Sequence, residues 1–303
     1  MITFSQQVKQ ELCAVIADRP CCRRALLYGI LLFGHTFSRN EVKIVTKYDC
    51  IVSIFQETTQ ELLGFSFEQK VMGDGKTVLS LRDKTHLYAL FDLYDYGHSM
   101  SIALHINNAL LEDECCRSTF LRGAFLSAGA VNAPMTDELR TTTEKFHLEI
   151  SGSHYYVMRE FLALLREMAL DPRLTRRKSG YVIYFKAAEA IGDVLLLAGA
   201  QSAYMTVVMA QMERQLRNDV NRKVNCETGN LTRIVEAATQ HRIATQKLMD
   251  SGAFAALSED LQKTAMLRVE NPEWSLSELA EALSISKSAL NHRLRKIVQL
   301  SKE

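Results

Sequence analysis

The segment CCRRALLYG at Cys21–Gly29 returns later in the chain as CCRSTFLRG at Cys115–Gly123. Both ends of the match are offset by 94 residues, since 115 − 21 and 123 − 29 give the same number. The Cys-Cys-Arg start, one leucine and the final glycine coincide, and each copy continues into an apolar stretch, LYGILLFGH or LRGAFLSAGAV. A match at a fixed offset indicates an internal repeat. The first part of the chain is therefore predicted to be a duplication.

Elements of the same kinds are expected after each copy of the motif. Alternating and helical apolar patterns predict a helix, strands, a second helix, further strands and a third helix in both halves. For the first half we expect strands at 41–48 and 51–56, a helix at 57–63, a hairpin at Gly73-Asp74-Gly75 and a helix at 84–94. For the second half we expect a loop at Pro134, strands at 146–151 and 181–187, and helices at 154–168 and 189–200.

Two such halves predict an α+β fold, in which a pseudo-symmetric saddle forms around two closely packed, glycine-bearing helices. We assign this domain to residues 1–205, with repeats at about 1–98 and 112–205. Strand signals end there, so residues 206–255 are expected to form a helical linker. Residues 256–303 are expected to form a separate all-α domain.

The composition is typical of a folded protein. Its net charge is close to zero, so overall charge does not attract nucleic acid or a membrane. Of 303 residues, 47% are hydrophobic, 14 are glycine and 4 are proline, which excludes disordered and collagen-like classes. Lys and Arg total 36 against 35 Asp and Glu, so a nucleic acid must be met by a local basic patch. The N-terminal sequence lacks a signal-peptide pattern, and the longest apolar run, 25–34, is too short to span a bilayer. We therefore expect a cytoplasmic protein that does not bind a membrane.

A helix-turn-helix is predicted near the C-terminus. Ser275 followed three residues later by Glu278 is the capping-box pattern at the start of a helix. Ser286 is then expected to cap a second helix at 287–298. Two helices joined by about three residues form a helix-turn-helix, and an upstream helix at 258–269 would complete a three-helix core.

The second helix of this pair separates apolar from polar side chains. Leu290, Leu294 and Ile297 recur at helical spacing and are expected in the core. Residues 286–303 hold five bases and one acid, whereas 257–285 hold two bases and six acids. Amide and cationic side chains can address base edges and phosphates, so we expect this helix to bind DNA; the alternative is the solvated face of a protein-binding bundle. The expected DNA-binding residues are Ser286, Lys287, Ser288, Asn291, His292, Arg293, Arg295 and Lys296.

Two other basic segments are secondary candidates for phosphate contact. The first lies in an expected hairpin, for which a solvated turn is the simpler interpretation. The second lies in an amide-rich stretch of the linker. This stretch either contacts phosphates, docks a domain, or is a connecting helix whose Asn residues cap neighbouring turns. The residues concerned are Arg176, Arg177, Lys178, Arg217, Arg222 and Lys223.

The stretches LYGILLFGH and LRGAFLSAG resemble the LAGLIDADG helices of homing endonucleases. The resemblance implies a close helix pair, in which the residue before the last motif position supplies a metal-binding carboxylate. Aligned on the first glycine of each motif, these positions hold Gly34 and Ala128, so both carboxylates needed for metal-dependent cleavage are missing. Asp137 and Glu138 follow in an expected loop, but nothing in the sequence fixes their geometry. We expect no catalytic residues.

The degenerate repeat, the string RNDVNRKVNCETGNL and the C-terminal NPEWSLSELAEALSISKSALNHRLRKI together resemble the WhiA family of bacterial DNA-binding proteins over nearly the whole chain. The resemblance implies a C-terminal module similar to the promoter-reading domain of sigma factors. It also implies a transcription factor or nucleoid-associated protein linked to cell division and chromosome segregation, and to sporulation in filamentous relatives. One departure is the compact turn Leu283-Ser284-Ile285-Ser286, where relatives often carry an extra residue or a proline.

The cysteines are expected to be reduced thiols. There are seven, an odd number, and two pairs are adjacent in sequence, which does not suit a disulfide framework. The pairs Cys21/Cys22 and Cys115/Cys116 could meet near the pseudo-two-fold axis and bind Zn²⁺. Adjacent cysteines chelate poorly, however, and cysteine is often buried, so we expect neither a metal nor a cofactor. Cys226 has no histidine near it in sequence and is expected to line a helix.

The sequence thus predicts a non-enzymatic protein that binds double-stranded DNA, is associated with the nucleoid, and has protein partners in transcription or cell division. One alternative is a divergent metal-dependent endonuclease that uses other carboxylates. Another is a scaffold whose terminal bundle binds a protein instead of DNA. Salt separates DNA binding from apolar docking, because phosphate contacts weaken steeply as salt rises.

Overall fold

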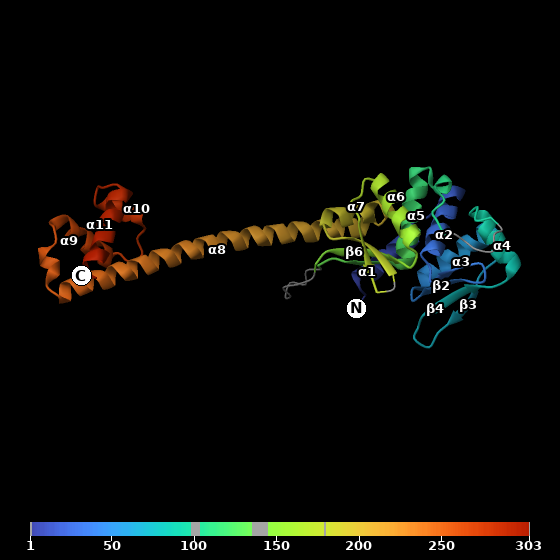
Figure 1. Cartoon of the computed structure of the whole chain (residues 1–303), viewed down its shortest axis with the longest axis horizontal. Coiled ribbons are helices and arrows are strands. Elements are labelled where there is room, and N and C mark those ends of the chain that lie inside the picture. The colour runs from blue at the N-terminus through green and yellow to red at the C-terminus, as the bar shows by residue number, and fades with distance from the viewer. Residues whose placement is uncertain (1, 98–103, 135–144, 179, 303) are drawn as a thin grey trace. The chain divides into compact units, whose positions relative to one another are not determined.

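The computed structural model describes residues 2–97, 104–134, 145–178 and 180–302 (Figure 1). The chain divides into two compact units, Met1–Arg214 and Gln215–Glu303, and each is considered by itself. The boundary between the units falls within one long helix, α8 (Gln201–Asp250). The domain divisions expected after residues 205 and 255 stay predictions.

The first unit consists of two halves with the same order of elements. After α1 (Phe4–Ala14), the first half contains α2 (Pro20–Leu32), β1 (Thr36–Phe37), β2 (Val42–Thr46), α3 (Asp49–Leu63), β3 (Glu68–Val71), β4 (Thr77–Leu81) and α4 (Lys84–Leu93). After the short 3-10 helix Asn108–Leu111, the second half contains α5 (Glu114–Ala128), β5 (Gly129–Asn132), β6 (His147–Gly152), α6 (Tyr155–Glu167), β7 (Arg173–Arg177), β8 (Gly180–Phe185) and α7 (Ala188–Ala198). The predicted duplication is confirmed element by element.

Each half forms its own four-stranded antiparallel sheet. The strand orders are β1-β2-β4-β3 and β5-β6-β8-β7, so corresponding strands occupy corresponding places. In both sheets, alternate residues of the central strands face the shared core; Ile44 and Leu79 do so in one sheet, and Leu148 and Ile183 in the other. The helices supply the remainder of one continuous apolar core, as expected for an α+β fold.

Helices α2 and α5 lie side by side at the centre of this core (Figure 1). A Cβ atom at Gly29 would meet the carbonyl oxygen of Phe120 and lie 2.8 Å from the amide nitrogen of Ala124. A Cβ atom at Gly123 would meet the carbonyl oxygen of Leu26 in the same way. Because only glycine allows the two backbones to approach this closely, the glycines of the repeated motif fix the helix pair.

The strand expected at 51–56 is wrong, because this segment belongs to helix α3. Ile51, Val52, Phe55 and Thr59 are buried at helical spacing, and Gly64 ends the helix in the left-handed conformation with φ 76°. The helix expected at 57–63 is therefore the second half of a longer one. The other expected strands and helices of both halves are present, and the hairpin at Gly73-Asp74-Gly75 joins β3 to β4.

The second unit is all-helical. After the C-terminal part of α8 and a 3-10 turn at Ala253–Ala256, it contains α9 (Glu259–Glu270), α10 (Leu276–Ala282) and α11 (Lys287–Leu300). Leu248 of α8, Leu261 of α9, Leu279 of α10 and Leu294 of α11 are members of one buried cluster. The expected upstream helix and both helices of the helix-turn-helix are thus present.

Within the part of the chain that the structure describes, no helix combines the length and the apolar composition needed to cross a membrane.

Candidate nucleic-acid interface

Helix α10 and the turn after it set the direction of α11. The Ser275 side chain accepts a hydrogen bond from the Glu278 backbone N–H, and the Glu278 carboxylate accepts one from the Ser275 N–H at 2.7 Å. This is the predicted capping box, and it lowers the pKa of the Glu278 carboxyl through the hydrogen bonds from Ser275. At the end of α10, the Ile285 N–H donates to the carbonyl oxygen of Ala280, while Ser284 adopts a left-handed φ of 53°. The compact turn therefore closes without an added glycine or proline.

Helix α11 begins where the sequence predicts and presents two distinct faces. The Ser286 hydroxyl accepts a hydrogen bond from the Ala289 N–H at 3.2 Å, so Ser286 is the N-cap. Leu290, Leu294 and Ile297 are buried in the core of the second unit. The expected contact residues Ser286, Lys287, Ser288, Asn291, His292, Arg295 and Lys296 are all exposed. Because residues three or four apart share a helix face, the last four of these residues form one polar stripe along α11.

Arg293 differs from the other expected contact residues. Its guanidinium lies 2.7 Å from the Asp260 carboxylate on α9, and its side chain is only 23% exposed. This ion pair joins α11 to α9. Arg293 is therefore placed to hold α11 in position. Its proximity to Asp260 has no local signal in the sequence.

A second arginine joins the long helix to this bundle. Arg268 of α9 is buried and donates to the carbonyl oxygen of Trp274 before α10 and, at 3.2 Å, to that of Ile234 on α8. His241 of α8 lies nearby; burial and, to a smaller extent, the Arg268 charge lower the pKa of its imidazole from 6.5 to about 4. Sequence reasoning singled out neither residue, because helical patterns do not show which buried cation reaches which carbonyl.

The three cationic candidates on α8 lie apart from this stripe along the chain. Arg217, Arg222 and Lys223 are exposed, and the guanidinium of Arg222 lies 3.9 Å from the Asp219 carboxylate one turn earlier. Such solvated i, i+3 pairs contribute little energy. Cys226 lies on the same helix and is expected from the sequence to be a helix-lining thiol. In the structure this thiol is exposed.

The hairpin candidates belong to the first unit and point in different directions. Arg177 on β7 lies 3.4 Å from the Glu149 carboxylate on β6, which partly neutralises it. Arg176 pairs in register with Tyr181 and Arg177 with Gly180, so these neighbours lie on opposite faces of the sheet. Lys178 is exposed at the turn with φ 51°. The hairpin therefore offers a smaller uniform basic surface than its sequence suggests.

The positions where the LAGLIDADG resemblance implies metal-binding carboxylates hold no acid. A Cβ atom at Gly34 would collide with Cδ1 of Ile44 and lie 3.0 Å from the carbonyl oxygen of Leu31. Ala128 ends α5 without a carboxylate of its own. Asp137 and Glu138, considered above as substitutes, lie outside the described residues. The structure thus places Ile44 beside Gly34, where the resemblance implies a metal-binding carboxylate.

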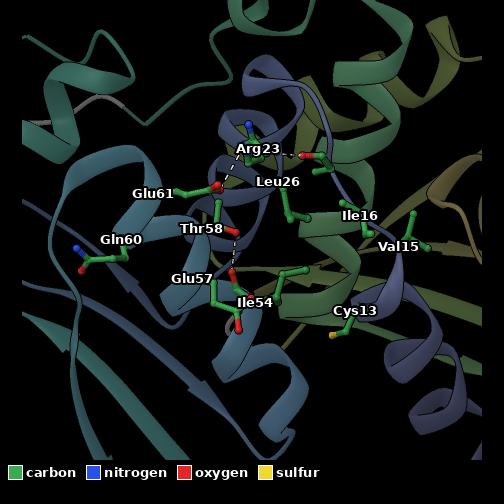
Figure 2. Close-up of a pocket in the computed structure, with 11 residues that line it drawn as sticks. Cys13, Val15, Ile16, Arg23, Leu26, Ile54, Glu57, Thr58, Gln60 and Glu61 are labelled. Atoms are coloured by element: carbon green, nitrogen blue, oxygen red, sulfur yellow. Dashed lines mark hydrogen bonds and ion pairs between the residues drawn. The ribbon is translucent and has the colours of Figure 1, made fainter.

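A groove of about 730 Å³ in the first unit was not expected from the sequence (Figure 2). Glu57 and Glu61, one helical turn apart on α3, line it together with Arg23 of α2. The Arg23 guanidinium lies 3.3 Å from the Glu61 carboxylate and also donates to the carbonyl oxygen of Ala17. With its cation paired and two carboxylates in its wall, the groove is a poor surface for phosphates.

Comparisons with known proteins agree with this architecture. A family model described as the WhiA LAGLIDADG-like domain matches residues 117–217, and one described as the WhiA C-terminal HTH domain matches residues 220–301. A curated relative from Moorella thermoacetica is 31% identical over all of this chain and 92% of its own length. One from Macrococcus caseolyticus is 30% identical over all of this chain and 96% of its own length. The chain belongs to the WhiA family.

Membership of the WhiA family confirms the resemblance drawn from the repeated motif, the linker string and the C-terminal helices. Both WhiA relatives are named probable cell division protein. The crystal structure of full-length DUF199/WhiA from Thermatoga maritima covers 99% of this chain with a TM-score of 0.59 at 21% identity, and 98% of that chain is matched. This likeness shows that the WhiA fold is shared, with a LAGLIDADG-like first domain and a helical C-terminal domain.

Proposed function

We propose that this WhiA-family protein binds double-stranded DNA through the exposed face of α11 and does not cleave it. The observation that carries the proposal is the polar stripe of α11, in which Asn291, His292, Arg295 and Lys296 are exposed while the opposite face is buried. A helix of this kind after a tight turn fits the DNA major groove. Asn and Arg can hydrogen bond to base edges, and Lys can bind phosphates.

The proposal extends to a regulatory role in the cell. We propose a sequence-specific or nucleoid-associated protein that regulates transcription in cell division and chromosome segregation, within the cytoplasm. The names of the curated relatives support the link to cell division. The first unit would then serve as a surface for protein partners in transcription or division, with Arg176 and Lys178 as secondary phosphate contacts.

The non-enzymatic part of the proposal rests on Gly34, Ala128 and the packing of Ile44. Hydrolysis of a phosphodiester by bound metal ions needs carboxylates to hold those ions near the scissile phosphate. We expect purified full-length protein to leave supercoiled plasmid intact in Mg²⁺ or Mn²⁺ over hours. If metal-dependent nicking activity co-purifies with the protein, the alternative function, a divergent metal-dependent endonuclease, is correct.

The DNA-binding part is tested by the salt dependence of binding. Selection from a random duplex library supplies a labelled site, and fluorescence anisotropy then gives the affinity of the full chain over a salt series. Lys296→Ala is expected to reduce the slope of log affinity against log salt by about 0.9, the value for one lost phosphate contact. Lys263→Ala removes an exposed cation from α9, outside the proposed surface, and is expected to leave the slope unchanged.

Two results would contradict this part of the proposal. If affinity hardly depends on salt, contact with DNA phosphates is not its source, and the scaffold function is favoured. If the two variants change the slope equally, the effect of Lys296 is one of overall charge and not of position on α11.

A further inference from the structure

The structure brings together the four cysteines of the repeated motif, which the proposed function does not use. Their sulfur atoms all lie within 4.8 Å of one another. We call this group the four-cysteine cluster; its members are Cys21, Cys22, Cys115 and Cys116. They occupy the second and third positions of α2 and of α5, so the cluster has the same pseudo-two-fold symmetry as the repeat.

Two adjacent cysteines on one helix chelate a metal ion poorly. The packing of α2 against α5 changes this, because each helix supplies two sulfurs to a common centre. The sulfurs of Cys22 on α2 and Cys116 on α5 each therefore lie within 4.8 Å of both sulfurs of the other helix. The close packing of α2 against α5 at the motif glycines thus brings the four ligands together. No loop has to fold around the metal ion.

The distances suit a tetrahedral site. A Zn–S bond of about 2.3 Å places the sulfurs of a four-thiolate site about 3.8 Å apart. The separations in the four-cysteine cluster, all within 4.8 Å, exceed this by at most about 1 Å, which changes of cysteine rotamer can close. An all-sulfur donor set favours zinc and other thiophilic ions over Mg²⁺ or Ca²⁺, which prefer oxygen.

Two features near the sulfurs stabilise a thiolate, whereas burial acts against it and raises the pKa of the Cys22 and Cys116 thiols. Both pairs lie in the first turn of a helix, where the unpaired N–H groups stabilise anions. The Arg19 guanidinium donates to the Cys115 sulfur at 3.8 Å. Cys22 and Cys116 are buried while their neighbours are partly exposed, so an ion can enter from one side and become enclosed on the other.

We propose that the four-cysteine cluster is a structural Zn²⁺ site that clamps the N-terminal ends of α2 and α5. Binding exchanges each thiol proton for a Zn–S bond, so the ion enters as Zn²⁺ and the protons leave to solvent without any change of redox state. The clamp lies at the opposite end of the helix pair from Gly34 and Ala128, the positions that hold carboxylates in a nuclease. The proposal does not depend on DNA binding.

The test uses full-length protein stripped of metal under reducing conditions and titrated with Co²⁺, which shows visible bands in a tetrahedral thiolate site. We expect one Co²⁺ per chain, displaced by Zn²⁺, and a higher thermal unfolding midpoint with Zn²⁺ than with chelator. The double variant Cys21→Ser, Cys115→Ser removes one ligand from each helix at the less buried positions and should lose both effects. Cys226→Ser, an exposed thiol on α8, should keep them.

Several outcomes would overturn the proposal. One is the absence of tetrahedral cobalt bands in the wild-type protein. Another is their persistence in the double variant, provided that its circular dichroism shows a folded protein. A third is a disulfide between Cys22 and Cys115 in protein alkylated immediately on cell lysis, because that bond would consume two of the ligands.

Discussion

At the residue scale, two glycines determine how closely the halves of the first unit approach each other. A methyl group at position 123 would press on the carbonyl oxygen of Leu26 and lie 3.0 Å from the amide nitrogen of Ile30, and neither backbone atom can move without shifting a helix. We expect Gly123→Ala to destabilise the protein by about 1–3 kcal/mol, the usual cost of overpacking. Thermal unfolding followed by circular dichroism measures this loss.

The matched control is Gly73→Ala in the β3–β4 hairpin, where a Cβ atom would meet no atom within 4 Å. It should leave the unfolding midpoint nearly unchanged. Equal midpoints for the two alanine variants would contradict the close helix contact.

Two arginines separated by one residue on α11 are expected to behave differently. Arg293→Ala breaks the ion pair with Asp260 and should lower the stability of the second unit by up to about 1 kcal/mol, since the pair is partly exposed. Arg295→Ala removes an exposed side chain and should leave stability unchanged while weakening DNA binding. Urea unfolding followed by the fluorescence of Trp274, the single tryptophan, reports on the second unit within the full chain. A larger loss of stability in Arg295→Ala than in Arg293→Ala would show that the structural role assigned to Arg293 is wrong.

At the element scale, the packing of α8 against α9 makes the second unit sensitive to acid. An unfolded chain protonates His241 near pH 6.5, but burial beside Arg268 lowers the pKa in the folded state to about 4. Between these pH values the unfolded state binds more protons, so stability falls as the pH falls. We expect a loss of about 1 kcal/mol from pH 7 to pH 5 that His241→Gln removes, allowing for partial exposure of the imidazole.

Trp274 fluorescence during urea unfolding at each pH measures this loss. The control is His292→Gln on the exposed face of α11, which should keep the wild-type pH dependence. If the free energy of unfolding of the His241→Gln variant falls between pH 7 and pH 5 as much as that of the wild type, other groups cause the acid sensitivity.

The elements predicted correctly are those specified by local signals. Each helix of the helix-turn-helix is specified by signals that span only a few residues. These are the caps at Ser275 and Ser286 and the apolar spacing of α11, so both helices can be predicted from the sequence. The alternating pattern at 51–56 predicts a strand, whereas the burial of Thr59 shows that the helical period continues through this segment. The repeat indicates that the four cysteines could meet near the pseudo-two-fold axis, and the structure brings their sulfurs together. The pairing of Arg293 with Asp260 depends on how α11 packs on α9, which single-sequence patterns do not contain.

At the scale of the whole molecule, the two units have different proposed roles. The first is a WhiA LAGLIDADG-like domain whose symmetric core is intact and whose catalytic positions hold glycine and alanine. The second presents the polar face of α11, the surface proposed to read DNA. The first unit thus supplies a closely packed LAGLIDADG-like domain, and the proposed recognition surface lies on the helical second unit.

The central claim is that α11, and not the hairpin of the first unit, is the principal DNA surface. The most direct measurement is fluorescence anisotropy of a labelled duplex with three full-length proteins at one salt concentration: wild type, Asn291→Ala with Arg295→Ala, and Arg176→Ala with Lys178→Ala. Each base contact contributes about 1–3 kcal/mol, so the α11 variant should bind at least about tenfold more weakly, while the hairpin variant stays within about threefold of wild type. Wild-type affinity in the α11 variant together with a large loss in the hairpin variant would contradict the account.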